Sequence, residues 1–370
     1  MEKLFVIVLL LIATLKSFAG EIKITANLTG FSDTAVVYLL SGQTPIAHQT
    51  LTQGKVTLTA DVAETPQSYI MYIVDNNQPY YTELFVANET IEVTAKKEDF
   101  PYQIKVTGSE YNKIKVLFDK KQLPVHTKTQ AMQQEILALQ QSGEWEKPEV
   151  QEKYIGEDGI GTKLTKELKQ NEMDFILAYL DTPFGFNMLE YNKTLDKQEF
   201  YKAVYSKMSP QQKQTKIGKQ YLLASQSKRL TKGDTFIDIN LLNKDLKAEK
   251  LSDYFNKDKE YVMVDLSSVS CPSSRQAFEI TQELIKNTDK IHVVSVLQSP
   301  DAATYQQFSA YSTNNWAIVY AEDFTRTDTY IQYQENATPT FLLFDKTGKL
   351  IDRWTGAAVY QQKLEQYLGK

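Results

Sequence analysis

Strict alternation of apolar and polar residues marks the first part of this chain, from Glu21 to about Thr107. Two of its apolar runs are Ile22, Ile24, Ala26 and Leu28, and Val56, Leu58 and Ala60. A period of two is that of a strand with one buried face. The turn-forming clusters Gln53-Gly54 and Asp75-Asn76-Asn77 lie between apolar stretches. The pattern predicts an all-β domain over residues 20–108, with about six to eight short strands packed as a sandwich or open barrel.

The region from Tyr111 to Ser227 loses this alternation and becomes charged and rich in glutamine. Apolar residues now recur at helical spacing, as in Met132, Ile136, Leu137 and Leu139. The helix-breaking residues are Pro148, Gly156, Gly159, Gly161 and Pro183-Phe184-Gly185. We expect a helical segment over residues 109–227 with roughly four or five helices, among them helices near 171–179 and 197–207.

From Gly233 onward, strand-like and helix-like runs alternate. The expected strands cover 261–266, 291–297 and 340–344, and the expected helices cover 275–286, 305–312 and 360–368. This order predicts an α/β domain over residues 228–370, with a central sheet and helices on its faces. The fold class is therefore multidomain α+β, with a sandwich-like β domain, a helical middle segment and a C-terminal α/β domain.

Composition and charge argue against nucleic acid as a partner. The 370 residues are 42% hydrophobic and 24% charged, which is ordinary for globular domains. Lys and Arg total 41 against 46 Asp and Glu, without a long run of either sign. We therefore expect no basic surface for phosphates.

The first residues are typical of an export signal. Lys3 is basic, Phe5 to Leu15 is an apolar run, and Ser17-Phe18-Ala19 places small residues at the expected cleavage positions. Because Lys16 ends the run short of the roughly 20 residues that span a bilayer, a membrane anchor is disfavoured. We expect a signal peptide over residues 1–19, no integral membrane segment after its cleavage, and a location in the periplasm or cell envelope.

Metal and cofactor sites are not expected. The three histidines, His48, His126 and His292, are scattered and lack other metal ligands at suitable spacing. The stretch from Gly156 to Lys163 resembles a phosphate loop, but its Thr162-Lys163 order is reversed and charged residues precede it.

Cys271 is the single cysteine of the chain, so no internal disulfide can form. An apolar strand precedes it, and Pro272 suits the first position of a helix. Cys271 should therefore lie near the N-cap, where unpaired backbone N–H groups and the helix dipole favour an anion. Such sites lower a thiol pKa from ~8.5 to ~3.5–7.5, whereas burial raises it. The alternative is a buried structural thiol.

Residues from about Leu230 to Lys370 resemble the thioredoxin-like proteins of the periplasmic TlpA type. The resemblance rests on the segments 232–236, 262–266, 293–296 and, most specifically, 337–350, which resembles the cis-proline loop and closing hairpin of that family. The upstream regions resemble a β-rich domain of unknown function and a helical segment that precede such modules in exported bacterial proteins; the stretches 169–179 and 200–205 fit that helical segment.

The active-site resemblance is incomplete. The family's Trp-Cys-x-x-Cys motif falls on residues 270–274, so the attacking cysteine is Cys271, while Ser270 replaces the tryptophan and Ser274 replaces the resolving cysteine. A thiolate that attacks a disulfide is normally released by the second thiol. Here an external thiol must complete the reaction, or the adduct persists.

Four further residues are site candidates. Ser274 lies one helical turn after Cys271, where its hydroxyl is either a donor to the thiolate or a capping group. By resemblance, Thr338 and Pro339 form a cis peptide beside Cys271 that orients a substrate strand, the alternative being a rigid turn. Asp265 occupies the family's buried acid position; it is either a carboxylate with a raised pKa or, as we favour, an Asp facing a polar cavity or edge.

These residues support three hypotheses. The first is an exported monothiol oxidoreductase that forms mixed disulfides with exported proteins or small thiols. The second is a binding or scaffolding module with a degenerate site. The third is a one-cysteine peroxidase, which Ser268 fits, but Val264 stands where such enzymes carry proline.

Overall fold

The computed structural model describes residues 19–192, 197–255, 258–286, 288–299, 301–321, 328–335 and 337–369. They form two compact units that divide between Tyr191 and Asn192. Residues 1–18 lie outside the described ranges, and the predicted signal peptide lies there with them. Its last predicted residue, Ala19, begins strand β1.

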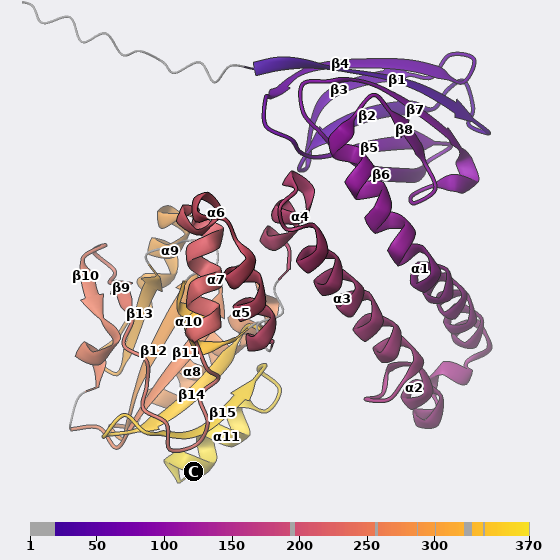
Figure 1. Cartoon of the computed structure of the whole chain (residues 1–370). Coiled ribbons are helices and arrows are strands. Elements are labelled where there is room, and N and C mark those ends of the chain that lie inside the picture. The colour runs from indigo at the N-terminus through magenta and orange to yellow at the C-terminus, as the bar shows by residue number, and fades with distance from the viewer. Residues whose placement is uncertain are drawn as a thin grey trace, which may run out of the picture. The chain divides into compact units, whose positions relative to one another are not determined.

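The first unit contains the predicted all-β domain, which is confirmed as two four-stranded sheets (Figure 1). Its strands are β1 (Ala19–Thr29), β2 (Val36–Ser41), β3 (Thr44–Thr50), β4 (Lys55–Ala63), β5 (Gln67–Asp75), β6 (Gln78–Val86), β7 (Thr90–Lys96) and β8 (Lys105–Thr107). The sheet orders are β4-β1-β7-β8 and β3-β2-β5-β6. Alternate residues of both sheets point inward and share one apolar core, as the period-two pattern predicts.

The predicted turns lie where expected. Asn76 and Asn77 both have positive φ angles between β5 and β6, as do Gln53 and Gly54 before β4. At Gly54 a side chain would also collide with the backbone, because an added Cβ would lie 2.9 Å from the Leu28 carbonyl oxygen. Glycine is therefore required at that turn.

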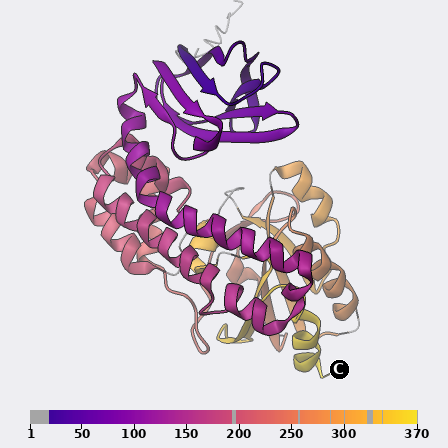
Figure 2. The same ribbon diagram turned by 90° about the vertical axis from the view of Figure 1, so that its right-hand side faces the viewer.

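Four helices complete the first unit. They are α1 (Glu110–Ser142), α2 (Pro148–Ile155), α3 (Ile160–Tyr179) and α4 (Pro183–Asn187). The α1 and α3 helices run side by side (Figures 1 and 2), and the Gln122 amide on α1 donates to the Leu168 carbonyl on α3 over 3.1 Å. The first turn of α1 is hydrogen-bonded to the β-sandwich, because the Phe85 N–H on β6 donates to the Asn112 side chain.

The helices α5 (Gln198–Lys207), α6 (Pro210–Gln214) and α7 (Lys216–Gln226) belong to the second unit. The segment predicted as one helical region over 109–227 is therefore divided between the two units. Within its described residues there are seven α-helices, more than predicted. The short helices α4 and α6 were missed because each begins at a proline, and Gly161, predicted as a breaker, lies inside α3.

The second unit also contains the predicted α/β domain. Its strands are β9 (Asn240–Leu242), β10 (Ala248–Lys250), β11 (Tyr261–Ser268), β12 (Ile291–Gln298), β13 (Trp316–Ala321), β14 (Thr340–Asp345) and β15 (Leu350–Thr355). The sheet order is β10-β9-β13-β12-β11-β14-β15. The β11, β12 and β13 strands are parallel, whereas β14 and β15 form an antiparallel hairpin at one edge.

Helices cover both faces of this sheet. They are α8 (Pro272–Ile285), α9 (Ala302–Ser309), α10 (Asp328–Tyr333) and α11 (Tyr360–Leu368). The α8, α9 and α11 helices share one apolar cluster with the sheet, and α10 contributes Tyr330 and Tyr333 to the cluster on the other face. The α7 helix packs against α10. The predicted elements match these within a few residues, whereas β9, β10, β13 and α10 were not predicted.

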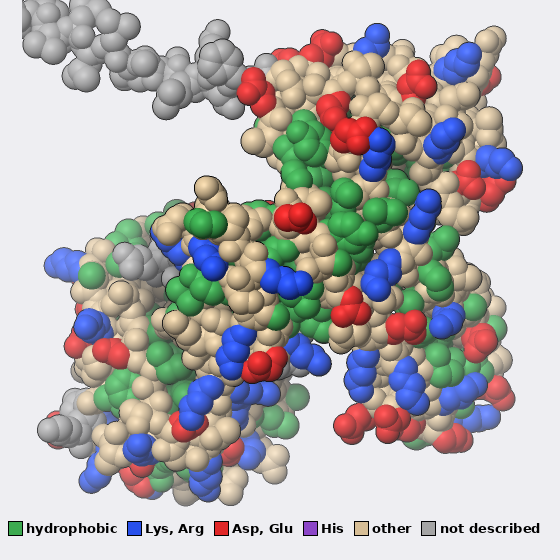
Figure 3. Space-filling view, viewed as in Figure 1, with side chains coloured by type: hydrophobic (Ala, Val, Ile, Leu, Met, Phe, Trp, Pro, Cys, Tyr) green, Lys and Arg blue, Asp and Glu red, His purple; other side chains and the backbone are tan. Residues whose placement is uncertain are grey.

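Two surface properties bear on the sequence predictions. Basic and acidic side chains are interspersed on the face shown in Figure 3. In the part of the chain that the structure describes, no helix combines the length and apolarity needed to cross a bilayer.

Candidate functional site

Cys271 lies just after the carboxyl end of the interior strand β11, as the N-cap of α8. Its backbone N–H donates to the Ser268 carbonyl, and its own carbonyl accepts from the Arg275 N–H, both over 3.1 Å. The side chain makes no capping hydrogen bond and is partly exposed. The side chain of residue 271 therefore does not occupy the first backbone N–H groups of this 14-residue helix. These N–H groups can stabilise a negative charge on the sulfur.

The Pro339 loop reaches the same sulfur. The Thr338–Pro339 peptide bond is cis, and the Cys271 thiol donates a hydrogen bond to the Thr338 carbonyl over 3.3 Å. The next carbonyl, that of Pro339, accepts from the Gly356 N–H over 2.9 Å. The structure thus brings Cys271, Thr338 and Pro339 together. The backbone carbonyls of Thr338 and Pro339 each already accept one hydrogen bond within the protein.

The pKa of the Cys271 thiol is lowered from its ordinary value. Burial is the largest single influence and raises this pKa. The Ser274 N–H, the Thr338 side chain, the Ser274 hydroxyl and the Ser273 N–H together outweigh burial by stabilising the thiolate. The site therefore favours the nucleophilic form of the sulfur at neutral pH more than an isolated cysteine would.

Ser274 is buried within the first turn of α8. Its oxygen accepts from the Ser268 N–H over 3.2 Å, which leaves the hydroxyl proton free to point toward the sulfur. This geometry supports the donor interpretation over the capping interpretation.

Replacing Ser274 by alanine should raise the pKa of Cys271, because a donor to the thiolate is lost. It should also cost about 1–3 kcal/mol of stability, because the buried Ser268 N–H loses its acceptor. The alkylation rate of Cys271 measured against pH reports the first effect.

Ser273→Ala is the matched control for this prediction. The Ser273 hydroxyl accepts from the Ala357 N–H, whereas only the backbone N–H of Ser273 acts on the sulfur. Equal midpoints in the two variants would contradict the role assigned to the Ser274 hydroxyl.

Asp265 is 1% exposed in the middle of β11, between β12 and β14, so it does not lie at an edge of the sheet. Its two carboxylate oxygens accept from the Ser267 hydroxyl over 2.5 Å and the Ser295 hydroxyl over 2.8 Å. Burial raises its pKa to about 6, and the two serine hydrogen bonds only partly oppose this. The sequence could not show this burial, because it depends on β11 having neighbours on both sides.

The residues that surround Asp265 were not among the predicted site residues. Ser295 lies opposite Asp265 in the parallel β11–β12 register and accepts from the Trp316 indole N–H over 2.9 Å. Tyr330 is buried, and its hydroxyl donates to the Ser267 carbonyl over 3.0 Å. A serine inside the apolar run 291–297 was the one available signal for this network.

The remaining motifs lie outside the site or lack its contacts. The Ser268 hydroxyl pairs with the Ser270 hydroxyl over 3.0 Å, and no described hydrogen bond joins it to the sulfur, which gives the peroxidase hypothesis no support. No group of three or more potential ligands that could hold a metal occurs among the described residues. His292 is partly buried near the start of β12, and this position places it at the other end of the parallel strands from Cys271.

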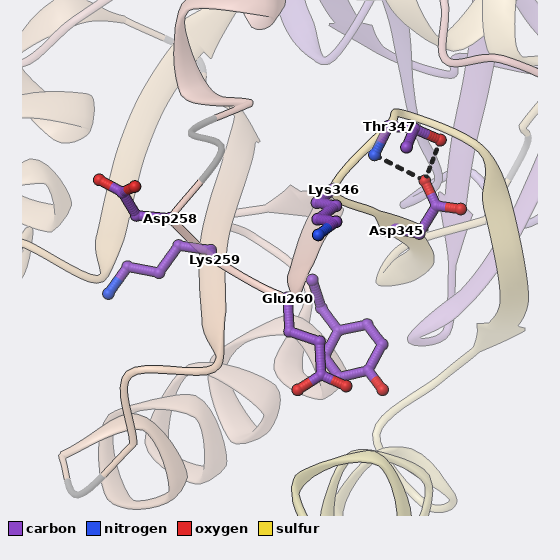
Figure 4. Close-up of a pocket in the computed structure, with 7 residues that line it drawn as sticks. Asp258, Lys259, Glu260, Asp345, Lys346 and Thr347 are labelled. Carbon is purple, nitrogen blue, oxygen red and sulfur yellow. Dashed lines mark hydrogen bonds between the residues drawn. The ribbon is translucent and has the colours of Figure 1, made fainter.

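A hollow lies at that other end of the sheet (Figure 4). It measures about 470 Å³ and lies between the start of β11 and the turn after β14. Asp345 accepts from the Thr347 N–H and hydroxyl within it, beside Lys346, Lys259 and Glu260. With ~3.3 Å of rise per residue, Tyr261 lies ~23 Å along β11 from Ser268, so this hollow is separate from the Cys271 site.

Two family models match this chain, one in each of its two compact units. Residues 248–370 match the family described as the thioredoxin-like domain, and residues 22–114 match the domain of unknown function DUF4369. The chain therefore carries a C-terminal thioredoxin-like domain preceded by a DUF4369 domain. This confirms the predicted resemblance to a thioredoxin-fold module behind a β-rich domain of unknown function.

Solved structures with similar folds include three bacterial proteins. A Chlorobium tepidum protein described as the thiol:disulfide interchange protein DsbE is 26% identical, with a TM-score of 0.32 over 37% of this chain and 94% of its own. A thiol-disulfide oxidoreductase from Bacteroides fragilis is 19% identical, with a TM-score of 0.32 over 36% and 100%. The exposed lipoprotein thioredoxin of Streptococcus pneumoniae is 22% identical, with a TM-score of 0.28 over 36% and 98%. No curated protein matches the chain.

Proposed function

We propose that this protein is an exported monothiol oxidoreductase that works through Cys271 in the periplasm or cell envelope. The observation that carries the proposal is the position of the sulfur: it is partly exposed at the N-cap of α8, beside the Thr338 carbonyl, with its pKa lowered. Low thiol pKa and access together distinguish reactive cysteines from structural ones.

The proposed reaction uses one thiol of the protein and one from outside. The Cys271 thiolate attacks one sulfur of a partner disulfide, a mixed disulfide forms, and the other partner sulfur leaves as a thiolate. Because the chain has no second cysteine, an external thiolate must attack the mixed disulfide and release Cys271. The partners are exported proteins or small thiols, and Thr338 and Pro339 are the proposed substrate-binding residues.

Trapping with a disulfide substrate tests this proposal. The protein is incubated with a disulfide-bonded peptide, quenched with acid and analysed by mass spectrometry. We expect one peptide adduct on Cys271, which a small thiol such as glutathione removes, and none with Cys271→Ser. A native protein that forms no adduct with excess peptide would contradict the proposal.

The second candidate is a binding or scaffolding module. The single thiol favours it, because a site without a resolving cysteine cannot release its own adduct. Cys271→Ser separates the two candidates in cells. If the phenotype and the set of bound partners survive this substitution, the thiol is incidental and the binding role holds.

A further inference from the structure

The buried carboxylate of Glu335 holds the start of the Pro339 loop in place. Glu335 lies four residues before Pro339 and is 3% exposed. The Arg353 guanidinium on β15 donates to its carboxylate, and Arg229 lies 3.9 Å from the other carboxylate oxygen. A buried carboxylate is costly unless it is paired, so this pairing fixes Glu335 to the edge strand.

The same arginine also holds the chain that leads into the thioredoxin-like domain. The second guanidinium nitrogen of Arg353 donates to the Leu230 carbonyl over 3.2 Å. The planar Arg353 side chain of β15 thus connects the start of the Pro339 loop with the residues that follow α7.

A second connection runs from the loop root to helices α5 and α7. The Gln334 side chain, one residue before Glu335, donates to the Ser227 carbonyl at the end of α7. The Gln198 amide at the start of α5 donates to that same carbonyl over 2.9 Å and to the Ser225 carbonyl over 3.0 Å. The end of α7 therefore bonds directly to Gln334, and α5 is joined to it through the shared Ser227 carbonyl.

We propose that Gln334 and Glu335 are positioning residues for Cys271: they anchor the Pro339 loop to α5, α7 and β15, and so hold Thr338 against the sulfur. This inference rests on the proposed function of Cys271. It implies that α5 and α7 help to hold the site in place. It also gives a role to two residues outside the predicted active-site motif.

Glu335→Gln tests the inference, because glutamine keeps the shape and removes the charge. Thr338 contacts the sulfur, so a displaced loop should change the rate of Cys271 alkylation below its midpoint pH by about fivefold, a size typical of broken coupling networks. The matched control is Glu283→Gln, which removes the charge of an exposed ion pair with Lys286 on α8.

Hydrogen exchange of the Gly356 amide gives a readout that does not depend on thiol chemistry. This N–H donates to the Pro339 carbonyl, so it reports the loop itself. We expect faster exchange in Glu335→Gln than in Glu283→Gln at equal global stability. If Glu335→Gln does not fold, Gln334→Asn replaces it, because asparagine tolerates the φ of 50° at this position but is too short to reach Ser227.

The outcomes separate the two proposals. Unchanged Gly356 exchange and unchanged alkylation in a folded variant would overturn the positioning role, whatever the thiol does. Faster Gly356 exchange in the variant would support the anchoring of the loop. If the wild-type thiol nevertheless titrates like a free cysteine, the proposed function is refuted and the anchoring stands.

Discussion

Asp265→Asn is expected to stabilise the thioredoxin-like domain by about 3 kcal/mol near pH 7, because each pKa unit is worth ~1.4 kcal/mol. The carboxyl group titrates at 3.8 when unfolded and at about 6 in the folded protein, where burial penalises its charge. The folded state therefore holds the proton more tightly than the unfolded state. Stability falls as pH rises from about 4 to about 6, and asparagine, which cannot ionise, avoids this loss.

The pH dependence distinguishes this mechanism from better packing. Urea unfolding of both proteins should give a difference near zero at about pH 4, which grows up to about pH 6 and then stays constant. The Ser267 and Ser295 hydroxyls donate to different carboxylate oxygens, so in the asparagine variant one hydroxyl donates to the amide oxygen and the other turns to accept from the amide N–H.

Asp345→Asn is the control of opposite sign. Burial raises the pKa of Asp345, but hydrogen bonds from the Thr347 hydroxyl, the Lys349 N–H and the Thr347 N–H outweigh it, and the pKa is lowered. Its contribution to stability is present above the unfolded pKa and is lost as pH falls, so Asp345→Asn should destabilise the protein near pH 7. A stabilisation by Asp265→Asn that does not change with pH would contradict the account of Asp265.

Ser274→Cys is expected to convert the site from single-thiol to two-thiol chemistry. The residue occupies the position of the family's resolving cysteine, one helical turn after Cys271, and its hydroxyl helps to lower the Cys271 pKa. A thiol placed there can attack the mixed disulfide, which releases the reduced partner and leaves a disulfide between Cys271 and the introduced cysteine. Dithiothreitol, present as the reductant, then regenerates the two thiols.

Insulin reduction in the presence of dithiothreitol measures this gain. The wild-type protein should add little to the rate of dithiothreitol alone, whereas the variant should turn over repeatedly. The matched control is Ser273→Cys, in which the second thiol lies one residue away, at a hydroxyl position that contacts the Ala357 N–H. Equal rates for the two variants would show that Ser274 does not face the sulfur as described.

The position of Cys271 could be predicted because its signals are local. An apolar strand, a serine-rich turn and Pro272 together indicate the start of a helix, and Ser274 follows on the same turn. Thr338 lies 67 residues away in sequence, so its contact with the sulfur could be predicted only through the family resemblance.

Other features depend on tertiary packing that no local pattern encodes. The environment of Asp265 depends on the pairing of β11 with β12 and β14, which brings Ser295 opposite the carboxyl group. The assignment of α5 and α7 to the second unit depends on contacts such as that between α7 and α10. The partners of Gln334 and Glu335 follow from the same packing, and neither residue belongs to a recognisable motif.

Titration of the Cys271 thiol shows whether the start of α8 holds a reactive thiolate. The rate of alkylation by iodoacetamide is measured against pH in the native protein, with Cys271→Ser as the blank. We expect a single midpoint below the ~8.5 of a free cysteine, because the start of α8 and Ser274 stabilise the thiolate. A midpoint at or above that of a free cysteine, or a thiol that reacts only after unfolding, would contradict it.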